Sequence, residues 1–262
     1  MRLIGTAASG LRAQQVAMDT IGNNLANVNT LGFKASQADF AEALSVEVSA
    51  GNTKTGGTTG GVTLGLGSGV VYSAIGTDFK QGTLTHSDSP LDLGIDGAGF
   101  FQVKTPDGTT SYTRVGNFHV DGSGQLTDGQ GNVVQPKSLI PADATELSVA
   151  SNGEITGVSA GAKRILGQIS LVGFQNPEGL QKTGDNLFMS TVNSGTPQVG
   201  QPGTTIGNQV LGTIHGQSLE QSNVDLADSM TDLLQVQRAY QMNARLVSDG
   251  DQMWGTANSI RR

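Results

Sequence analysis

The sequence predicts an α+β fold in which helices at the two ends of the chain pair as a coiled coil, with a central all-β domain inserted between them. Three observations lead to this prediction. Apolar residues recur every seven positions at both ends of the chain. Short β-like segments punctuated by turn residues fill the middle, and a Gly/Thr-rich stretch separates the first helix from that middle.

The N-terminal helix is predicted from a narrow apolar seam. Its two heptad positions hold Ile4, Leu11, Met18 and Leu25, and Ala7, Gln14, Ile21 and Val28. Seven of these eight residues are apolar, and the positions between them are mostly polar, as in a coiled coil. Asparagines at 23–29 compete for backbone hydrogen bonds, so the helix should weaken there. Gly32 is the residue we expect just beyond its end.

Residues 51–69 are rich in glycine and threonine and predict an extended arm. An apolar alternation begins near its end, at Val62, Leu64, Leu66 and Val70. From about residue 83 to 216, β-like runs such as 100–103 and 111–114 alternate with turn signals. The turns come roughly every ten residues, a spacing typical of an all-β sandwich or irregular barrel.

The C-terminal helix is predicted from about residue 224 to 260. Its seam holds Leu219, Leu226, Leu233, Tyr240, Val247 and Trp254, with Met230 and Ala244 on the same side. Ser222 is the predicted N-cap, and Asp225 three residues later completes a capping box. Gly250 is a candidate interruption. An isolated domain has no use for so long a helix with so narrow a stripe, so its seam must be buried against another helix.

The composition excludes several functional classes. Glycine accounts for 38 of 262 residues, charged residues for 14% and aromatic residues for 5%, which is typical of a β-rich chain with many turns and a thin core. A net charge of −7 disfavours a nucleic-acid partner. Without cysteine there is no disulfide, thiolate site or thiol nucleophile. No segment is predicted to be a cleaved signal peptide or a membrane span, so any export should proceed without a cleaved leader.

No motif predicts a catalytic, cofactor or metal site. The three histidines, at 86, 119 and 215, are too widely spaced to form a metal pair. The run 65–69 lacks the spacing and following helix of a phosphate loop. The acidic turns at Asp121 and Asp128 resemble calcium loops but lack a bidentate glutamate, so hairpin turns explain them better. We therefore predict a protein that is not an enzyme, with no cofactor.

Three separated segments nevertheless carry a resemblance to a known family. The stretch 17–34, AMDTIGNNLANVNTLGFK, closely resembles the signature of bacterial flagellar rod and hook proteins. Residues 94–103, GIDGAGFFQV, and 112–118, YTRVGNF, resemble that family's central motif and the strands after it. Residues 222–244, from SNVD to QVQRAYQMNA, resemble its C-terminal motif. The motif positions singled out are Asn23, Asn24, Leu25, Ala26, Asn27, Gly32, Phe33, Gly97, Gly99, Phe100, Gln237, Arg238 and Tyr240.

The chain length and the run QVQRAYQMNA favour the distal-rod branch of this family, with a proximal rod or short hook subunit as the alternative. The resemblance implies a structural subunit that polymerises into a helical tube, transmits motor torque and encloses an export channel. It also implies a place in the flagellar basal body, reached through the flagellar export apparatus. The implied partners are copies of the chain, other rod and hook axial proteins, and ring proteins that surround the rod as a bushing.

The resemblance also suggests a division of the chain into layers. Residues 1–35 and 216–262 would form the inner helical layer, 36–79 an extended arm and intermediate layer, and 80–215 the central and outer β domain. Alternatives from other classes are a secreted β-sandwich adhesin with helical oligomerisation ends and a cell-wall hydrolase. The predicted helix and subunit contacts are Ile4, Leu11, Met18, Ile21, Leu25, Val28, Leu226, Met230, Leu233, Tyr240, Val247 and Trp254.

Overall fold

The computed structural model describes residues 2–43, 46–49, 63–66, 69–141, 143–159, 161–207 and 209–260. The chain forms two compact units. Unit 1 comprises residues 1–26, 36–76 and 225–262, and unit 2 comprises residues 27–35 and 77–224. Most of the predicted Gly/Thr-rich arm, 51–62 and 67–68, lies outside the described residues.

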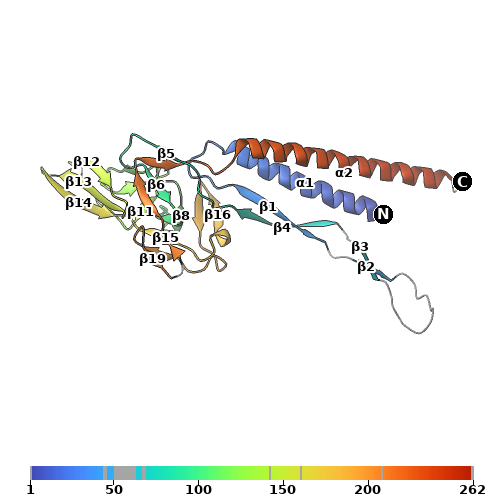
Figure 1. Cartoon of the computed structure of the whole chain (residues 1–262), viewed down its shortest axis with the longest axis horizontal. Coiled ribbons are helices and arrows are strands. Elements are labelled where there is room, and N and C mark those ends of the chain that lie inside the picture. The colour runs from blue at the N-terminus through green and yellow to red at the C-terminus, as the bar shows by residue number, and fades with distance from the viewer. Residues whose placement is uncertain are drawn as a thin grey trace, which may run out of the picture. The chain divides into compact units, whose positions relative to one another are not determined.

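Unit 1 contains two long helices and two β-ribbons. The helices are α1 (Arg2–Ala26) and α2 (Leu226–Ile260), which lie side by side and antiparallel (Figure 1). One ribbon pairs β1 (Ser36–Glu42) with β4 (Val70–Thr77), and the other pairs β2 (Val46–Ser49) with β3 (Thr63–Leu66). The pairing of terminal helices predicted from the heptads is confirmed.

The predicted helix ends needed correction. Helix α1 ends at Ala26, and Gly32 (φ +62°) instead lies in a turn beyond it. A Cβ on Gly32 would be 2.8 Å from Val115 Cγ2, so close approach within unit 2 requires glycine there. Helix α2 starts two residues later than predicted and runs through Gly250 without interruption. Gly250 is buried inside the helix and does not break it.

The predicted capping box of α2 was also wrong. Asp225 is the N-cap, because its Oδ1 accepts hydrogen bonds from the backbone N–H groups of Ala227 (2.8 Å) and Asp228 (3.2 Å). Ser222 lies three residues further out, and its Oγ accepts a bond from the N–H of Val224 (3.3 Å). Asp225 caps the helix because its carboxylate lies two and three residues before the N–H groups that it accepts from, a spacing it can bridge easily. Its negative charge is also favourable near the positive N-terminal end of the helix dipole.

Unit 2 is the predicted all-β domain, and its main sheet has nine strands. The order is β16-β17-β8-β7-β11-β10-β9, and β15 pairs with both β7 and β18. All of these pairings are antiparallel. The strands are β7 (Phe100–Lys104), β8 (Thr110–Thr113), β9 (His119–Val120), β10 (Leu126–Thr127), β11 (Val133–Gln135), β15 (Leu171–Gly173), β16 (Gln181–Gly184), β17 (Leu187–Met189) and β18 (Gln198–Gly200).

The remaining strands of unit 2 form small sheets. Strands β12 (Thr145–Val149), β13 (Glu154–Ser159) and β14 (Ala162–Gln168) make a three-stranded sheet. Two-stranded pairs join β5 (Leu84–His86) to β22 (Ser218–Glu220), β6 (Leu93–Asp96) to β21 (Thr213–Gly216), and β19 (Thr205–Ile206) to β20 (Gln209–Val210). A 3-10 helix spans Pro177–Gly179. The described strands close into no barrel, which leaves open sheets.

The predicted hairpin turns are where the strands reverse. Asp121 Oδ1 accepts from the N–H groups of Ser123 (2.8 Å) and Gln125 (2.7 Å) between β9 and β10. Asp128 Oδ1 accepts from those of Gln130 (3.0 Å) and Asn132 (2.8 Å) between β10 and β11. Both carboxylates are therefore engaged in turn hydrogen bonds of the kind that favours aspartate at such positions.

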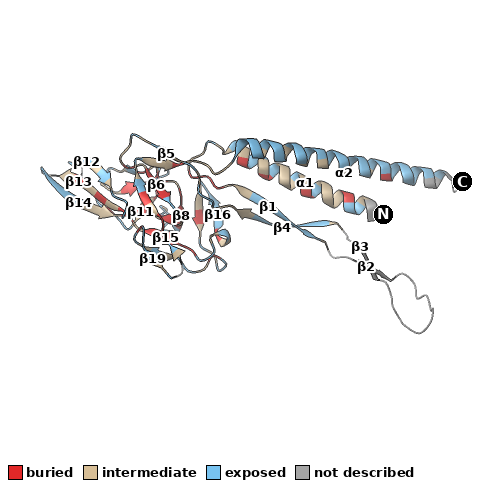
Figure 2. Cartoon of the chain, in the orientation of Figure 1, coloured by how far each residue is buried: buried red, intermediate tan, exposed pale blue. Residues whose placement is uncertain are grey.

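The core of the protein is in unit 2 (Figure 2). Two clusters of buried side chains fill it. The larger comprises Leu91, Leu93, Ile95, Phe101, Val103, Phe118, Leu126, Val134, Ile140, Ile155, Ile169, Leu171, Leu211 and Ile214. The smaller is aromatic and comprises Phe100, Tyr112, Val172, Phe174, Leu180 and Phe188. Phe100 and Phe101 are adjacent on β7, so the two faces of one strand supply the two clusters.

Candidate assembly interface

Helix α1 packs against α2 on one side and a β-ribbon on the other, within unit 1. A Cβ on Gly10 would lie 2.9 Å from Asn243 Nδ2, so glycine allows α2 to approach closely. On the other side, Ser9 Oγ accepts a hydrogen bond from the N–H of Val70, where β4 begins (3.3 Å). Asn24 is buried, and its side-chain amide pairs with both the N–H and C=O of Ser36 (2.8 Å each).

The seam predicted on α1 is only partly covered within one chain. Apart from Ala7, its apolar members are half-buried, and the other deeply buried positions of α1 lie outside the seam and hold small or polar residues. Because α1 contacts two neighbours, small side chains let both approach. The half-buried seam residues are Ile4, Leu11, Met18, Ile21, Leu25 and, beyond the helix, Val28, whereas the buried ones are Ala7, Ala13, Thr20 and Asn24.

Helix α2 leaves much of its apolar surface uncovered. Figure 2 shows most of α2 as exposed, in contrast to α1. Among the predicted seam residues, Leu233 and Val247 are half-buried. The others are exposed: Leu226 (46%), Met230 (49%), Tyr240 (37%) and Trp254 (53%). One helical partner covers one side of α2, so its remaining apolar side chains lack a partner in a single copy.

The heptad prediction found only part of an apolar row that runs along α2. Leu226, Met230 and Leu234 follow a spacing of four, as do Met242 and Leu246 further along. Leu234, Met242, Leu246 and Met253 are 47–60% exposed. The four-residue spacing was visible in the sequence. The seven-residue template took in Leu226 and Trp254, with Met230 beside them, but left Leu234, Met242, Leu246 and Met253 on the polar flank. We call the exposed set Leu226, Met230, Leu234, Met242, Leu246, Met253 and Trp254 the outer row.

Unit 2 contains a cluster of buried charged side chains that come from distant parts of the chain. Lys34 Nζ lies 2.6 Å from Glu220 Oε1, and both side chains are 0% exposed. Arg114 Nη1 lies 3.5 Å from Glu220 Oε2 with its side chain 4% exposed. Lys34 Nζ also donates to the backbone C=O of Lys80 (2.7 Å), and the N–H of Gly82 donates to Glu220 Oε1 (2.9 Å). The sequence reasoning did not find this cluster, because its members are far apart in the chain.

Two cations in this cluster share one carboxylate. Burial lowers the pKa of Lys34; the neighbouring Glu220 opposes that shift, and Arg114 adds to it. Burial likewise lowers the pKa of Arg114, and Glu220 opposes the shift. Two buried cations share one carboxylate, so the cluster holds one more positive than negative charge when all three groups are ionised.

Asn223 links three segments of the chain beside this charge cluster by hydrogen bonds. Its Oδ1 accepts a hydrogen bond from the N–H of Ala35 (2.8 Å), and its Nδ2 donates to the C=O of Asp78 (2.8 Å). The segment leaving α1, the segment entering the β domain and the segment preceding α2 are thus linked by partly buried hydrogen bonds. The backbone pairs β22 with β5 alongside. Residues of the N- and C-terminal motifs therefore meet inside unit 2.

The remaining motif positions serve backbone geometry and the core. Gly97 (φ +107°) and Gly99 (φ +137°) hold conformations that other residues rarely adopt, and a Cβ on Gly97 would meet Gly212 Cα at 2.9 Å. Phe100 is 2% exposed in the aromatic cluster. Phe33 is 3% exposed and lies 4.2 Å from Lys182 Nζ, measured to the ring centroid. Asn27 accepts a bond from Thr30 Oγ1 (3.2 Å), whereas Gln237 and Arg238 are exposed on α2.

Neither a metal group nor a membrane span is seen in the part of the chain that the structure describes. No three His, Cys, Asp or Glu side chains gather there as metal ligands would. Of its helices, neither is both long and apolar enough to cross a membrane. His215 Nε2 lies 3.5 Å from Asp96 Oδ2, both well exposed.

Comparison with protein families gives three matches along the chain. Residues 4–34 match the flagella basal body rod protein family. Residues 94–157 match the flagellar hook protein FlgE/F/G D1 domain, and residues 215–260 match the C-terminal region of the flagellar basal body rod FlgEFG proteins. The matches coincide with the three segments whose motifs we singled out.

Curated relatives match over the whole length. The chain is 37% identical over 265 residues to the flagellar basal-body rod protein FlgG of Caulobacter vibrioides, covering 100% of both chains. It is also 37% identical over 273 residues to FlgG of Bacillus subtilis, again covering 100% of both. The flagellar hook-basal body complex protein FlhP of Bacillus subtilis is 31% identical over 277 residues.

Proposed function

The chain belongs to the flagellar basal-body rod protein family and is a structural subunit of the flagellar distal rod, and we propose that its copies assemble through α1 and α2 into a helical tube. Its place is the flagellar basal body, and it is not an enzyme. It assembles with copies of itself and with other axial proteins of the flagellum. The observation that carries the tube proposal is the outer row, whose apolar side chains are uncovered in one copy.

The physical argument rests on the cost of exposed apolar surface. Burying such surface contributes about 25 cal/mol per Å², so a row of seven large side chains is a strong driving force for association. The α1–α2 pair presents different surfaces on its different sides. A contact between unlike surfaces of two copies leaves the same surfaces free at the two ends of the pair. When the rotation between copies does not close a ring, such a contact propagates into a helical filament, which is the assembly we propose.

The same reasoning assigns roles to the residues predicted from the heptads. We propose that Ile4, Leu11, Met18, Ile21, Leu25 and Leu233 lie at the pairing of α1 with α2, and that Met230, Tyr240 and Trp254 contact neighbouring copies. The domain assignment stays a proposal too: an inner layer of 1–35 and 216–262, an arm of 36–79 and a β domain of 80–215. In the tube, the inner layer would enclose an export channel and the stiff wall would transmit motor torque.

Two further partners are proposed. The export apparatus would carry the chain to the rod tip, and ring proteins would surround the finished tube. A proximal rod or short hook subunit is the alternative within the family. FlhP supports keeping that alternative, since a relative named for the hook-basal body complex also matches the chain.

The test is a charge placed on the outer row. Leu234 is 55% exposed, so Leu234→Asp should leave the free energy of unfolding of one copy within about 0.5 kcal/mol. It should block tube formation, because a carboxylate would be buried without a partner in the assembled state. Electron microscopy of purified protein and motility of cells carrying the variant are the measurements.

The matched control is Leu139→Asp, which makes the same change at a 66% exposed leucine of the β domain. This variant should form tubes as the wild type does. Tubes formed equally well by Leu234→Asp would contradict the assembly proposal.

A further inference from the structure

The peptide group between Ala35 and Ser36 lies where the chain passes from one compact unit to the other. Ala35 ends the 27–35 stretch of unit 2, and Ser36 begins the 36–76 stretch of unit 1. One rotatable bond lies on each side of this planar group, at the Cα of Ala35 and at the Cα of Ser36. The hydrogen bonds of this group therefore decide how freely the chain turns at this crossing.

The two ends of this peptide group are held by different units. Its C=O, which belongs to Ala35, accepts a hydrogen bond from the N–H of Asp78 in unit 2 (2.8 Å). Its N–H, which belongs to Ser36, donates to Oδ1 of Asn24 in unit 1 (2.8 Å). A turn about the first rotatable bond moves the oxygen away from Asp78, and a turn about the second moves the N–H away from Asn24. Neither turn is possible without breaking a hydrogen bond.

The two neighbouring peptide groups are held as well. The N–H of Ala35 donates to Asn223 Oδ1 in unit 2 (2.8 Å), and the C=O of Ser36 accepts from Asn24 Nδ2 in unit 1 (2.8 Å). Asparagine suits position 24 because one short side chain offers both an acceptor and a donor. Asn24 is only 9% exposed, so water competes little for its two bonds. All four backbone polar groups of Ala35 and Ser36 thus have protein partners.

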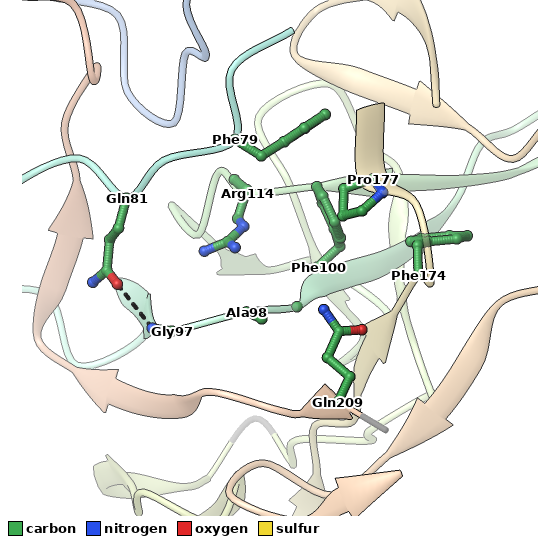
Figure 3. Close-up of a pocket in the computed structure, with 10 residues that line it drawn as sticks. Phe79, Gln81, Gly97, Ala98, Phe100, Arg114, Phe174, Pro177 and Gln209 are labelled. Atoms are coloured by element: carbon green, nitrogen blue, oxygen red, sulfur yellow. Dashed lines mark hydrogen bonds between the residues drawn. The ribbon is translucent and has the colours of Figure 1, made fainter. Parts of the chain in front are cut away.

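Asp78 is anchored in unit 2 by the residues that follow it. The ring of Phe79 packs edge-on against Phe100, with the ring centroids 5.3 Å apart. Gln81 Oε1 accepts a hydrogen bond from the N–H of Gly97 (2.9 Å), drawn as a dashed line in Figure 3. Both side chains line a pocket of about 210 Å³ within the β domain. The N–H of Asp78 therefore belongs to a segment that is packed into unit 2, and not to a free loop.

We propose that the Ala35–Ser36 peptide group is a fixed joint, at which the bonds to Asn24 and Asp78 keep the chain from turning between the two units. Asn24 and Asn223 are positioning residues of this joint, which gives a role to two asparagines of the terminal motifs. In a subunit that transmits torque, as proposed above, a twist of one unit would reach the other through the joint. The joint itself does not depend on that function.

The first experiment measures hydrogen exchange of the backbone N–H groups by NMR in the full-length chain. Asn24→Leu keeps the size of the side chain but removes both bonds to Ser36. Exchange of the Ser36 N–H should become about tenfold faster, as expected for loss of one hydrogen bond. Gln15→Leu is the control, because it removes an amide from an exposed position of α1. Unchanged exchange of the Ser36 N–H in Asn24→Leu would overturn the proposal.

The second experiment asks whether these bonds couple the two units. The chain has no cysteine, so two spin labels can be placed without background through Gln235→Cys in unit 1 and Asp107→Cys in unit 2, both at exposed positions. We expect a narrow distribution of distances between the labels in the chain that keeps Asn24. The distribution should broaden in Asn24→Leu and stay narrow in Gln15→Leu.

Two outcomes would contradict the joint. A broad distribution in the chain that keeps Asn24 would show that the units turn freely in spite of the hydrogen bonds. Faster exchange in Asn24→Leu without a broader distribution would show that Asn24 acts only locally. Asn24→Ala gives the same comparison if Asn24→Leu does not fold. Both measurements use single chains in solution, so a failure of the assembly proposal leaves them unaffected.

Discussion

At the scale of single residues, the stability of unit 2 depends on one carboxylate. Glu220 is the only acidic partner that the described residues offer to Lys34 and Arg114 within 4.0 Å, and all three side chains are buried. Breaking a buried ion pair from one side leaves the other charge without compensation, which costs more than the pair itself contributes. The identity of the residue removed therefore decides the size of the effect.

Glu220→Gln should destabilise unit 2 by about 3–5 kcal/mol, because it leaves two buried cations unpaired. Lys34→Met should lower the free energy of unfolding by less, about 1–2 kcal/mol. Glu220 is still paired with Arg114 in this variant, and the C=O of Lys80 still accepts a hydrogen bond from the Asn223 side-chain amide (3.2 Å). Urea unfolding measures both values, with Glu178→Gln on the exposed surface as the control. A larger loss of stability in Lys34→Met than in Glu220→Gln would contradict the view that two buried cations depend on the single carboxylate of Glu220.

Tyr112 gives the protein a pH dependence at alkaline pH. Burial raises the pKa of the Tyr112 hydroxyl above its ordinary value of 10.0, and a hydrogen bond with Ser190 opposes the shift. Below pH 10 the group is neutral in both the folded and unfolded states and has no effect. Above pH 10 the unfolded state loses the proton first, so it binds fewer protons and the free energy of unfolding falls as pH rises.

The measurement is urea unfolding between pH 8 and about 11, compared between the wild type and Tyr112→Phe. The variant should lose part of the decline above pH 10. An identical decline in the two proteins would exclude Tyr112 as its source.

At the scale of elements, α2 is a long helix of which only one side is buried by packing within a single copy. It has 35 residues, about 52 Å at 1.5 Å per residue, and α1 covers only one side of it. A helix with so little tertiary burial gains little stability from packing. Its local signals, above all the N-cap, therefore weigh more than they would in a buried helix.

Asp225→Ala should destabilise α2 by about 1 kcal/mol, because two backbone N–H groups lose their acceptor. Ser222→Ala should cost less, since the Ser222 hydroxyl accepts only one long bond from Val224. Hydrogen exchange of the first turn of α2 measures the difference. Equal protection in the two variants would contradict the assignment of the cap to Asp225.

At the scale of the whole molecule, each compact unit is built from separated stretches of chain. Residues 27–35 belong to unit 2 although they directly follow α1, because Phe33, Lys34 and Ala35 make their contacts there. A cut that removes both terminal helices must therefore spare these residues. The sequence suggests a cut after residue 35, where the predicted inner layer ends, and the structure suggests one after residue 26.

A chain of residues 27–224 should unfold at higher urea concentration than a chain of residues 36–223. The longer chain keeps Lys34 beside Glu220 and Phe33 beneath Lys182. The shorter chain loses both side chains, so Glu220 keeps only Arg114 and the space of the buried Phe33 ring is left empty. The difference should be about 3 kcal/mol or more, as for loss of a buried ion partner and a buried ring. Equal midpoints would mean that 27–35 contributes nothing to unit 2.

The sequence by itself determined the elements whose causes are local or periodic. Seven-residue spacing identified both terminal helices and their pairing, and turn residues such as Asp121 and Asp128 identified the β hairpins. These signals are readable because a helix face or a turn depends on neighbours a few residues away. The motifs at 17–34, 94–118 and 222–244 identified the family for the same reason: each is a continuous stretch.

Only the tertiary structure decided which residues meet across the chain. It brought Lys34, Arg114 and Glu220 together and left the outer row of α2 uncovered. In the structure the N-cap of α2 is Asp225 and not the predicted Ser222, and Gly32 lies in a turn against Val115 and not at the end of α1. The physical reason is that burial and charge compensation depend on distances in space, and contacts between residues 186 positions apart leave no periodic trace in the sequence.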